Sequence, residues 1–232
     1  MLKKTLLTLL VCLLVLPAAA QQYSRGADLD PEIYNRLPQK AVQLSRGYTG
    51  LPASVSLKNY APFPGDQGRY GSCTAWATAF AARTLSESIT VNRYDRIQTS
   101  GGVFSPAYLY KSISDDPLCL RGTVISHALD LMQKEGVLRM SDFERNADFI
   151  RVSPAMYRDS RKYTKGKPVI IGMNTPDSFM KITGKNLWQP VEDPAVNWGG
   201  HAMTVVGYDD DFAGRAFELQ NSGRHIPGTG LP

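Results

Sequence analysis

The sequence predicts an α+β protein with two lobes and a cleft between them. Residues from about 73 to 135 carry helical patterns, whereas residues from about 165 to 220 carry strand patterns. The chain has 232 residues, of which 43% are hydrophobic, enough for one large domain or two small lobes. Because the helix-forming and strand-forming segments are separate in the sequence, each can build one lobe. We expect a functional site where the lobes meet.

The first 20 residues have the features of an export signal. A basic start is followed by an apolar run over 5–17, which is short for a membrane span, and then by three alanines before Gln21. We therefore expect residues 1–20 to be a signal peptide, and the protein to be exported (periplasmic or extracellular) without stable membrane insertion. Residues 21–50 are polar and irregular and are expected to be an N-terminal leader or arm, ahead of one domain at 51–232.

Charge and cysteine content exclude several classes of function. The net charge is +5, and it falls to +3 when the two lysines of the signal peptide are removed. Because the basic residues form no arginine-rich run, we expect no nucleic-acid partner. The sequence contains no paired His/Cys spacing of the kind that predicts a metal site, and no cofactor is expected. Cys12 lies in the signal peptide, so Cys73 and Cys119 remain, either joined in a disulfide or free.

Three segments of the first half predict helices. The first is the alanine-rich stretch 73–87. The second is 105–112, with Ser105 as its cap and Pro106 at its first position. The third is 123–135, which is followed by a glycine that ends it. Its expected apolar face consists of Ile125, Leu129, Leu131 and Met132.

Extended segments flank these helices on both sides. Residues 51–57 read as an extended entry into the domain, and 61–65 as a turn-rich loop. In the second half, 168–172 and 201–208 are apolar runs of the kind found in buried strands. The stretch 215–220 alternates between polar and apolar residues, which predicts a half-buried strand.

Cys73 is the candidate nucleophile because it stands at the start of a predicted helix. The positive end of the helix dipole favours a thiolate there, and a thiolate is the form that attacks carbonyl carbons. Gln67 lies six residues earlier among glycines, so its amide could donate a hydrogen bond to the oxyanion that such an attack creates.

One of three histidines fits the role of a base. His127 lies inside an amphipathic helix and is expected at its surface or in packing, and His225 lies in a Gly/Pro-rich tail. His201 follows two glycines and opens an apolar strand, so we predict that it is the base; the alternative is an edge histidine that bonds to backbone. Asn221 follows the last strand and could orient the imidazole, although such an asparagine alone is usually a turn residue.

The order Gln67, Cys73, His201, Asn221 resembles that of the papain family of cysteine peptidases. His201 and Asn221 follow Cys73 by 128 and 148 residues, a spacing typical of that family. Residues next to these positions are also similar, in the sequences Gly-His-Ala, Gly-Tyr-Asp and Asn-Ser. Further similar segments lie at 51–55, 104–110 and 168–172, so the resemblance extends over about 51–222.

The resemblance implies a role for each of these residues. Cys73 would be the nucleophile and His201 the general acid and base, with Asn221 orienting the imidazole. Gln67 and the backbone N–H of Cys73 would form the oxyanion hole. It also implies a helical left lobe and an antiparallel, β-barrel-like right lobe. The implied function is a secreted cysteine peptidase that hydrolyses polypeptides through a thioester acyl-enzyme, as a monomer and without a cofactor.

The sequence departs from the family pattern at three places. Tyr70 stands where the family has a disulfide cysteine, so Cys119 is expected to be a free, buried thiol. Thr74 replaces the usual tryptophan after the nucleophile. Gly223 stands where a tryptophan and further strands are expected after Asn221, which indicates a truncated or altered C-terminus with missing strands.

Two alternative functions follow from these departures and from the chemistry. One is a catalytically inactive papain-like protein that binds peptides or serves as a scaffold. The other is a transferase that uses the same residues to pass the acyl group to an amine instead of water.

Overall fold

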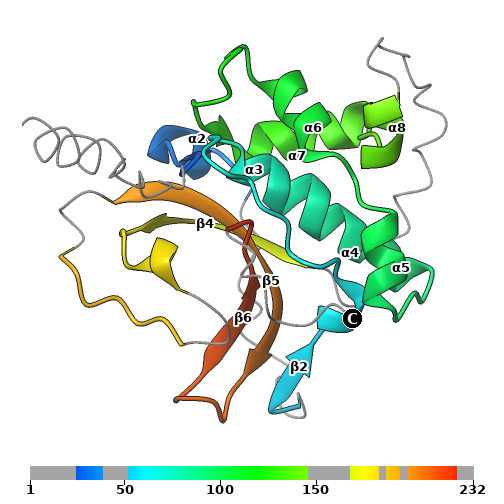
Figure 1. The fold of residues 1–232 in the computed structure, drawn as a ribbon. Coiled ribbons are helices and arrows are strands. Elements are labelled where there is room, and N and C mark those ends of the chain that lie inside the picture. Colours follow the sequence, from blue (N-terminus) through cyan, green and yellow to red (C-terminus); the bar gives the residue numbers. More distant parts are fainter. Residues whose placement is uncertain (1–24, 39–51, 146–167, 183–186, 194–197, 224–232) are drawn as a thin grey trace, which may run out of the picture.

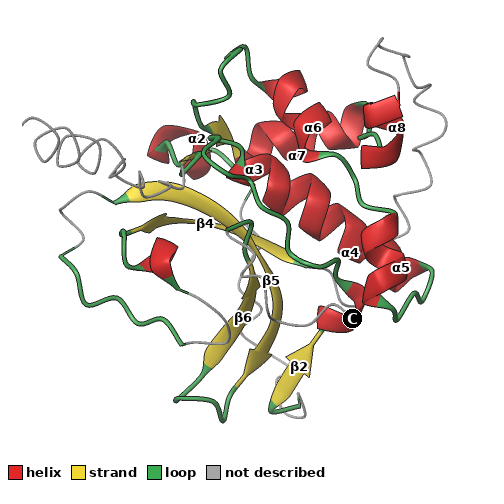
Figure 2. Ribbon diagram, viewed as in Figure 1, coloured by secondary structure: helices red, strands yellow, loops and turns green. Residues whose placement is uncertain are grey.

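The computed structural model describes residues 25–38, 52–145, 168–182, 187–193 and 198–223. Helices gather on one side of the molecule and a sheet on the other (Figure 2). The α+β class and the division into a helical lobe and a sheet lobe are therefore confirmed. Within the described ranges, no helix combines the length and the apolar composition needed to cross a bilayer.

The helical lobe is built around one continuous helix that begins at Cys73. It consists of α3 (Cys73–Ala75), the π-helical segment η2 (Trp76–Arg83) and α4 (Thr84–Thr90). Its alanines are buried, and their small side chains let other elements approach the helix closely. The helix predicted over 73–87 is thus confirmed, and it continues to Thr90.

Shorter helices complete this lobe. The 3₁₀ turn η1 (Lys58–Tyr60) leads into it, and α5 (Arg96–Gly101) begins where the Asp95 carboxylate accepts hydrogen bonds from two backbone N–H groups. Helix α6 (Pro106–Ile113) starts at Ser105, whose hydroxyl oxygen accepts from Tyr108 N, as predicted from the Ser-Pro pair. The remaining helices are α7 (Ile125–Lys134) and α8 (Met140–Arg145).

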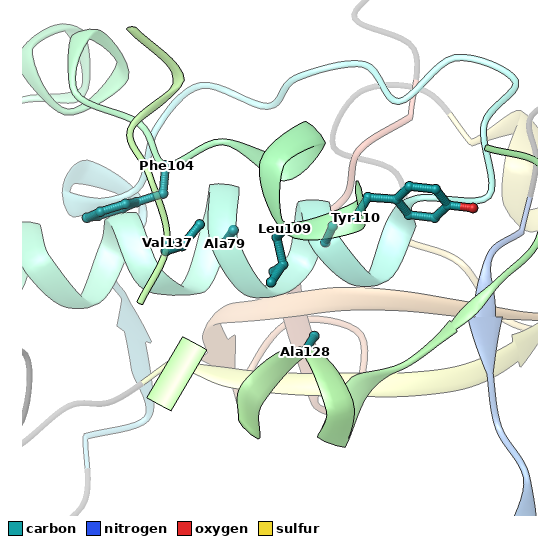
Figure 3. Close-up of a cluster of buried hydrophobic side chains, with 7 residues drawn as sticks. Ala79, Phe104, Leu109, Tyr110, Ala128 and Val137 are labelled. Atoms are coloured by element: carbon teal, nitrogen blue, oxygen red, sulfur yellow. The ribbon is translucent and has the colours of Figure 1, made fainter. Parts of the chain in front are cut away.

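The apolar face of α7 differs from the predicted one at one position. Leu129 is 42% exposed, whereas Ala128 is fully buried. Ala128 lies three residues after Ile125, so it falls on the same face of the helix and packs into the core. This core, drawn in Figure 3, consists of Ala75, Ala79, Phe104, Leu109, Tyr110, Ala128 and Val137.

The sheet lobe is a curved antiparallel sheet with β5 (Gly199–Asp209) at its centre (Figure 1). β4 (Val169–Thr175) pairs with the first part of β5, and β2 (Ser54–Ser56) pairs with its end. β6 (Ala216–Gln220) pairs with the other edge of β5. The 3₁₀ turn η4 (Phe179–Lys181) follows β4. The strands predicted in the second half are confirmed, and those described form an open sheet of four strands.

The described part of the predicted N-terminal arm lies between the lobes, beside α3 and β4 (Figure 1). β1 (Ala27–Asp28) pairs in parallel with β3 (Thr123–Val124) and also contacts β5. This pairing is why the helix predicted to start at 123 starts two residues later. After β1 the chain forms α2 (Pro31–Asn35), which is capped by the carboxylate of Asp30.

A buried hydrogen bond joins the two lobes. The hydroxyl of Thr204 in β5 donates to the carbonyl oxygen of Ala77, at 2.9 Å, and both residues are buried. Ala77 lies in the π-helical segment, where the helical hydrogen-bond pattern changes. The Thr204 hydroxyl therefore supplies a donor to a backbone carbonyl at the point where β5 crosses the helix.

We expect the substitution Thr204→Val to lower the free energy of unfolding by about 1–3 kcal/mol, because it leaves the buried Ala77 carbonyl without this donor. Chemical denaturation with urea measures the change. Thr90→Val is the matched control, since the Thr90 hydroxyl also donates to a helix carbonyl, that of Ser86, but at an exposed position. Equal losses in the two variants would contradict this role for Thr204.

Candidate active site

Cys73 is the first residue of α3, as predicted, and its side chain is fully buried. It is a free thiol, and so is Cys119, which is half-buried instead of buried as expected. The disulfide between Cys73 and Cys119, which the sequence allowed as one of two alternatives, is therefore not formed. The backbone N–H of Gly26 donates to the Cys73 sulfur at 3.1 Å, and the N–H of Ala202 also interacts with it.

Burial raises the pKa of the Cys73 thiol to about 11, from an ordinary value of 9.0. The N–H groups of Ala202, Gly26 and Thr74 favour the thiolate and offset part of this rise. The thiolate expected at a helix start is thus not the favoured form in this arrangement, because the cost of desolvating the charge exceeds the stabilisation by nearby dipoles. At neutral pH the thiol is protonated.

His201 is the third residue of β5 and is fully buried. Its Nε2 lies 2.7 Å from Oδ1 of Asn221, the residue that follows β6. The pairing of β5 with β6 brings the two together, so the histidine bonds to a side chain and not to backbone at a sheet edge. Nδ1 of His201 is buried, and no hydrogen-bond partner for it lies in the described part of the chain. The ring of Phe179 packs against the imidazole, with centroids 6.1 Å apart.

The environment of His201 favours the neutral imidazole. Burial lowers the pKa of His201, the hydrogen bond to Asn221 raises it in part, and the positive charge of Arg25 lowers it further. The shifts of both pKa values therefore favour the uncharged forms of Cys73 and His201 in the described arrangement.

The other two histidines do not join this site. His127 is exposed on α7, as predicted, and His225 lies outside the described residues. No group of three or more His, Cys, Asp or Glu side chains within the described ranges could hold a metal ion.

Gln67 is buried and is held by hydrogen bonds at both ends of its amide. Nε2 donates to the carbonyl oxygen of Tyr70 at 2.9 Å, and Oε1 accepts from the hydroxyl of Ser222 at 2.6 Å. Because Ser222 follows Asn221 directly, this contact brings Gln67 next to the His201–Asn221 pair. The sequence predicts no role for Ser222, although this residue lies next to Asn221.

The structure brings the four predicted residues into one region. Ala202, the neighbour of His201, contacts the Cys73 sulfur, and Ser222, the neighbour of Asn221, contacts Gln67. The candidate nucleophile, the candidate base with its amide partner, and the candidate amide donor therefore adjoin at the junction of the lobes. This is the set of groups that acyl transfer requires.

Residues 25–29, which we call the covering segment, run across the Cys73 thiol. Their backbone approaches glycines so closely that side chains would collide there. A Cβ on Gly26 would lie 2.0 Å from the carbonyl oxygen of Gly71, and a Cβ on Gly200 would lie 2.0 Å from that of Ala27. At one end of the segment, the guanidinium of Arg25 forms an ion pair with Asp177. The sequence did not indicate this covering.

At the other end of the covering segment, Leu29 occupies an apolar position near the thiol. It packs against the buried cluster that contains Cys73, Ile125 and Ala202. A Cβ on Gly172 would lie 2.7 Å from Cδ2 of Leu29 and 2.9 Å from Cδ1 of Ile125. Glycine at 172 therefore leaves the space that the leucine side chain needs.

We expect Gly26→Ala to speed the alkylation of Cys73 by iodoacetamide about tenfold, because the added Cβ collides with Gly71 and destabilises the covered arrangement by about 1.4 kcal/mol. Mass spectrometry of the alkylated peptides measures the rate, with half-buried Cys119 as the internal reference. Gly101→Ala is the control, since nothing lies within 4 Å of a Cβ there. Equal rates at Cys73 in the wild type and Gly26→Ala would contradict the covering.

The raised thiol pKa also predicts a pH dependence. The covered arrangement favours the neutral thiol. Its stability is therefore greatest below pH 9.0, the ordinary thiol pKa, and decreases as the pH rises towards about 11, the pKa of the buried thiol. We expect alkylation of wild-type Cys73 to keep accelerating into the alkaline range, and that of Gly26→Ala to level off at lower pH. A pH–rate profile measures both, and a wild-type plateau near neutrality would be inconsistent with the buried thiol.

Comparisons with known proteins agree with this architecture. Protein-family models and curated proteins yield no match to the chain. Among solved structures, the chain is similar to xylellain, a cysteine protease from Xylella fastidiosa, with 24% identity and a TM-score of 0.52. The match covers 87% of this chain and 85% of xylellain.

Two proenzymes of the same fold are also similar. Digestive procathepsin L 3 of Tenebrio molitor larval midgut is 18% identical, with a TM-score of 0.59 over 86% of this chain and 66% of that one. ProCathepsin B S9 from Trypanosoma congolense is 14% identical, with a TM-score of 0.59 over 86% and 76%. The architecture that the sequence resemblance implied is thereby confirmed: this chain has the fold of the papain-like cysteine proteases.

Proposed function

We propose that this protein is an exported cysteine peptidase that hydrolyses polypeptides through a thioester acyl-enzyme. The observation that carries the proposal is the 2.7 Å contact between His201 and Asn221, next to a free cysteine at a helix start. A papain-like fold supports the same class of activity. The described arrangement would be a latent form, and catalysis would follow once the covering segment leaves the thiol.

Acylation would begin with the transfer of the Cys73 thiol proton to Nδ1 of His201. The thiolate attacks the carbonyl carbon of the peptide, a C–S bond forms, and the carbonyl π electrons move onto the oxygen. The amide of Gln67 and the backbone N–H of Cys73 donate to this oxyanion. When the oxyanion collapses, the C–N bond breaks and the leaving amine takes the proton from His201.

Deacylation would repeat the sequence with water. His201 accepts a proton from the attacking water, the oxygen bonds to the thioester carbon, and the C–S bond breaks to release the acid. The departing sulfur regains the proton from the imidazolium. Asn221 would keep the ring in one orientation throughout, because it accepts from Nε2–H and leaves Nδ1 for the reacting groups.

The substrate would be an extended peptide lying where the covering segment lies now. That segment forms a short strand with β3, and its Leu29 fills an apolar position beside Ile125 and Gly172. We infer that a substrate peptide places an apolar side chain in the same position.

A second candidate is a papain-like protein that binds peptides without hydrolysing them. The covered thiol favours it, since burial holds the pKa of Cys73 at about 11 and the described arrangement therefore contains no thiolate at neutral pH. Such a protein would bind peptides in the cleft and would never form a thioester.

We expect an epoxysuccinyl inhibitor to label Cys73 stoichiometrically, and to do so faster in Gly26→Ala than in the wild type. We also expect Cys73→Ala to reduce peptide hydrolysis to the uncatalysed level. Mass spectrometry and a fluorogenic peptide assay measure the two effects. Cys119→Ala is the matched control, because it removes the other free thiol of the described chain and should leave hydrolysis unchanged. Peptide binding without any acyl-enzyme would favour the second candidate and overturn the first.

A further inference from the structure

Arg25, the first residue of the covering segment, contacts the sheet lobe with its charged end. Its guanidinium forms an ion pair with the carboxylate of Asp177, which lies two residues after β4. The Arg25 side chain is 16% exposed and that of Asp177 is 70% exposed, so the arginine lies against the protein and the aspartate lies at the rim of the contact. A positive charge of the covering segment is therefore matched by a negative charge of the lobe that it covers.

The Arg25 side chain can reach Asp177 because residue 199 is a glycine. A Cβ on Gly199 would lie 2.6 Å from Cδ of Arg25 and 3.2 Å from Cβ of Arg25. Gly199 begins β5 and pairs with Thr175, the last residue of β4, so two strand ends meet at this point. A long side chain therefore fits across the strand ends and brings its charge to Asp177, whereas a side chain at position 199 would collide with it.

The Arg25 side chain also lies on the imidazole side of the Cys73 thiol. The next residue, Gly26, donates its N–H to the sulfur at 3.1 Å. Burial lowers the pKa of His201, and the positive charge of Arg25, which lies near the imidazole, lowers it further. In the proposed reaction the leaving amine takes its proton from His201, so the part of a substrate that follows the scissile bond lies on this side. A substrate residue shortly after the scissile bond therefore occupies the place that Arg25 has now.

The turn that carries Asp177 is held by contacts within the sheet lobe. Nε1 of Trp188 donates to the hydroxyl of Ser178 at 3.3 Å, and the Trp188 ring packs against Phe179, with centroids 4.9 Å apart. The Ser178 hydroxyl also forms a hydrogen bond with the carboxylate of Glu192, which lowers the pKa of Glu192 and adds a second negative charge nearby. Because none of these contacts involves the covering segment, Asp177 keeps its position when that segment leaves.

We propose that Asp177 selects substrates that carry an arginine or a lysine at the first or second position after the scissile bond. The inference rests on the proposed peptidase function and adds a specificity-determining residue to it. In the described arrangement, Arg25 of the chain itself occupies this position. When the covering segment leaves, Asp177 loses that partner, and a substrate cation restores the ion pair.

The test uses the full-length protein and internally quenched peptides that differ at one residue. One set carries arginine, its uncharged analogue citrulline, or glutamate at the first position after the scissile bond, and a second set carries them at the second position. Mass spectrometry identifies the bond that is cleaved. We expect kcat/KM for arginine to exceed that for citrulline about fivefold at one of the two positions, roughly the upper end of the range for an exposed ion pair. The preference should decrease as salt is added, because salt screens the two charges.

Two substitutions of Asp177 separate charge from shape. Asp177→Asn keeps the size of the side chain and should bring the arginine-to-citrulline ratio to about one. Asp177→Lys should reverse the preference, so that the glutamate peptide is cleaved faster than the citrulline peptide. Each ratio compares two substrates of one variant, so any change in how readily the covering segment leaves cancels from it. Asp211→Asn is the matched control, because Asp211 is an exposed carboxylate between β5 and β6, beyond the end of β5 opposite to His201.

The outcomes distinguish this inference from the function on which it rests. If the wild type hydrolyses these peptides without preferring arginine over citrulline, the role of Asp177 is overturned while the peptidase function stands. The same holds if Asp177→Asn keeps the preference, or if Asp211→Asn abolishes it equally. If Cys73 is alkylated by iodoacetamide but none of the peptides is hydrolysed, the proposed function is overturned and the role of Asp177 with it.

Discussion

The contact between the Cys73 helix and strand β5 is the constraint on which the rest of the structure depends. β5 crosses the helix at close range because the helix presents alanines, and the Thr204 hydroxyl bonds to the Ala77 carbonyl at the crossing. Ala202 lies against the Cys73 sulfur in the same contact. The position of the imidazole on β5 therefore follows from how the helix and the strand pack, and a larger residue at the crossing would separate the thiol from the imidazole.

The covering segment affects the protonation of the groups at this contact. It encloses the thiol, so burial raises the pKa of Cys73. The pKa of His201 is lowered by burial and then by the positive charge of Arg25, the first residue of the segment. Both effects favour the neutral pair over a thiolate–imidazolium pair. A peptide main chain can pass this close because Gly26, Gly71 and Gly200 have no side chains to obstruct it. The same glycines would allow a substrate to approach equally closely.

The end of β6 links the two lobes through polar contacts. Asn221 and Ser222 extend from the sheet towards the helical lobe and bond to His201 and Gln67. Their hydrogen bonds are buried, so each is costly to lose and each restricts the orientation of a side-chain amide. A change after β6 would therefore affect His201 and Gln67 together.

The sequence by itself determined the elements and the candidate residues. Alanine-rich and apolar runs predicted the helix at Cys73 and the strands at His201 and Asn221, because periodicity and capping are local properties of a chain. Tertiary structure alone decided that residues 25–29 lie on the thiol, that Ser222 holds Gln67, and that Leu129 is exposed while Ala128 is buried. Tertiary structure also decided that the Cys73 thiol favours its protonated state. A helix start favours the thiolate, but burial has the larger effect, and burial depends on segments that are distant in the sequence.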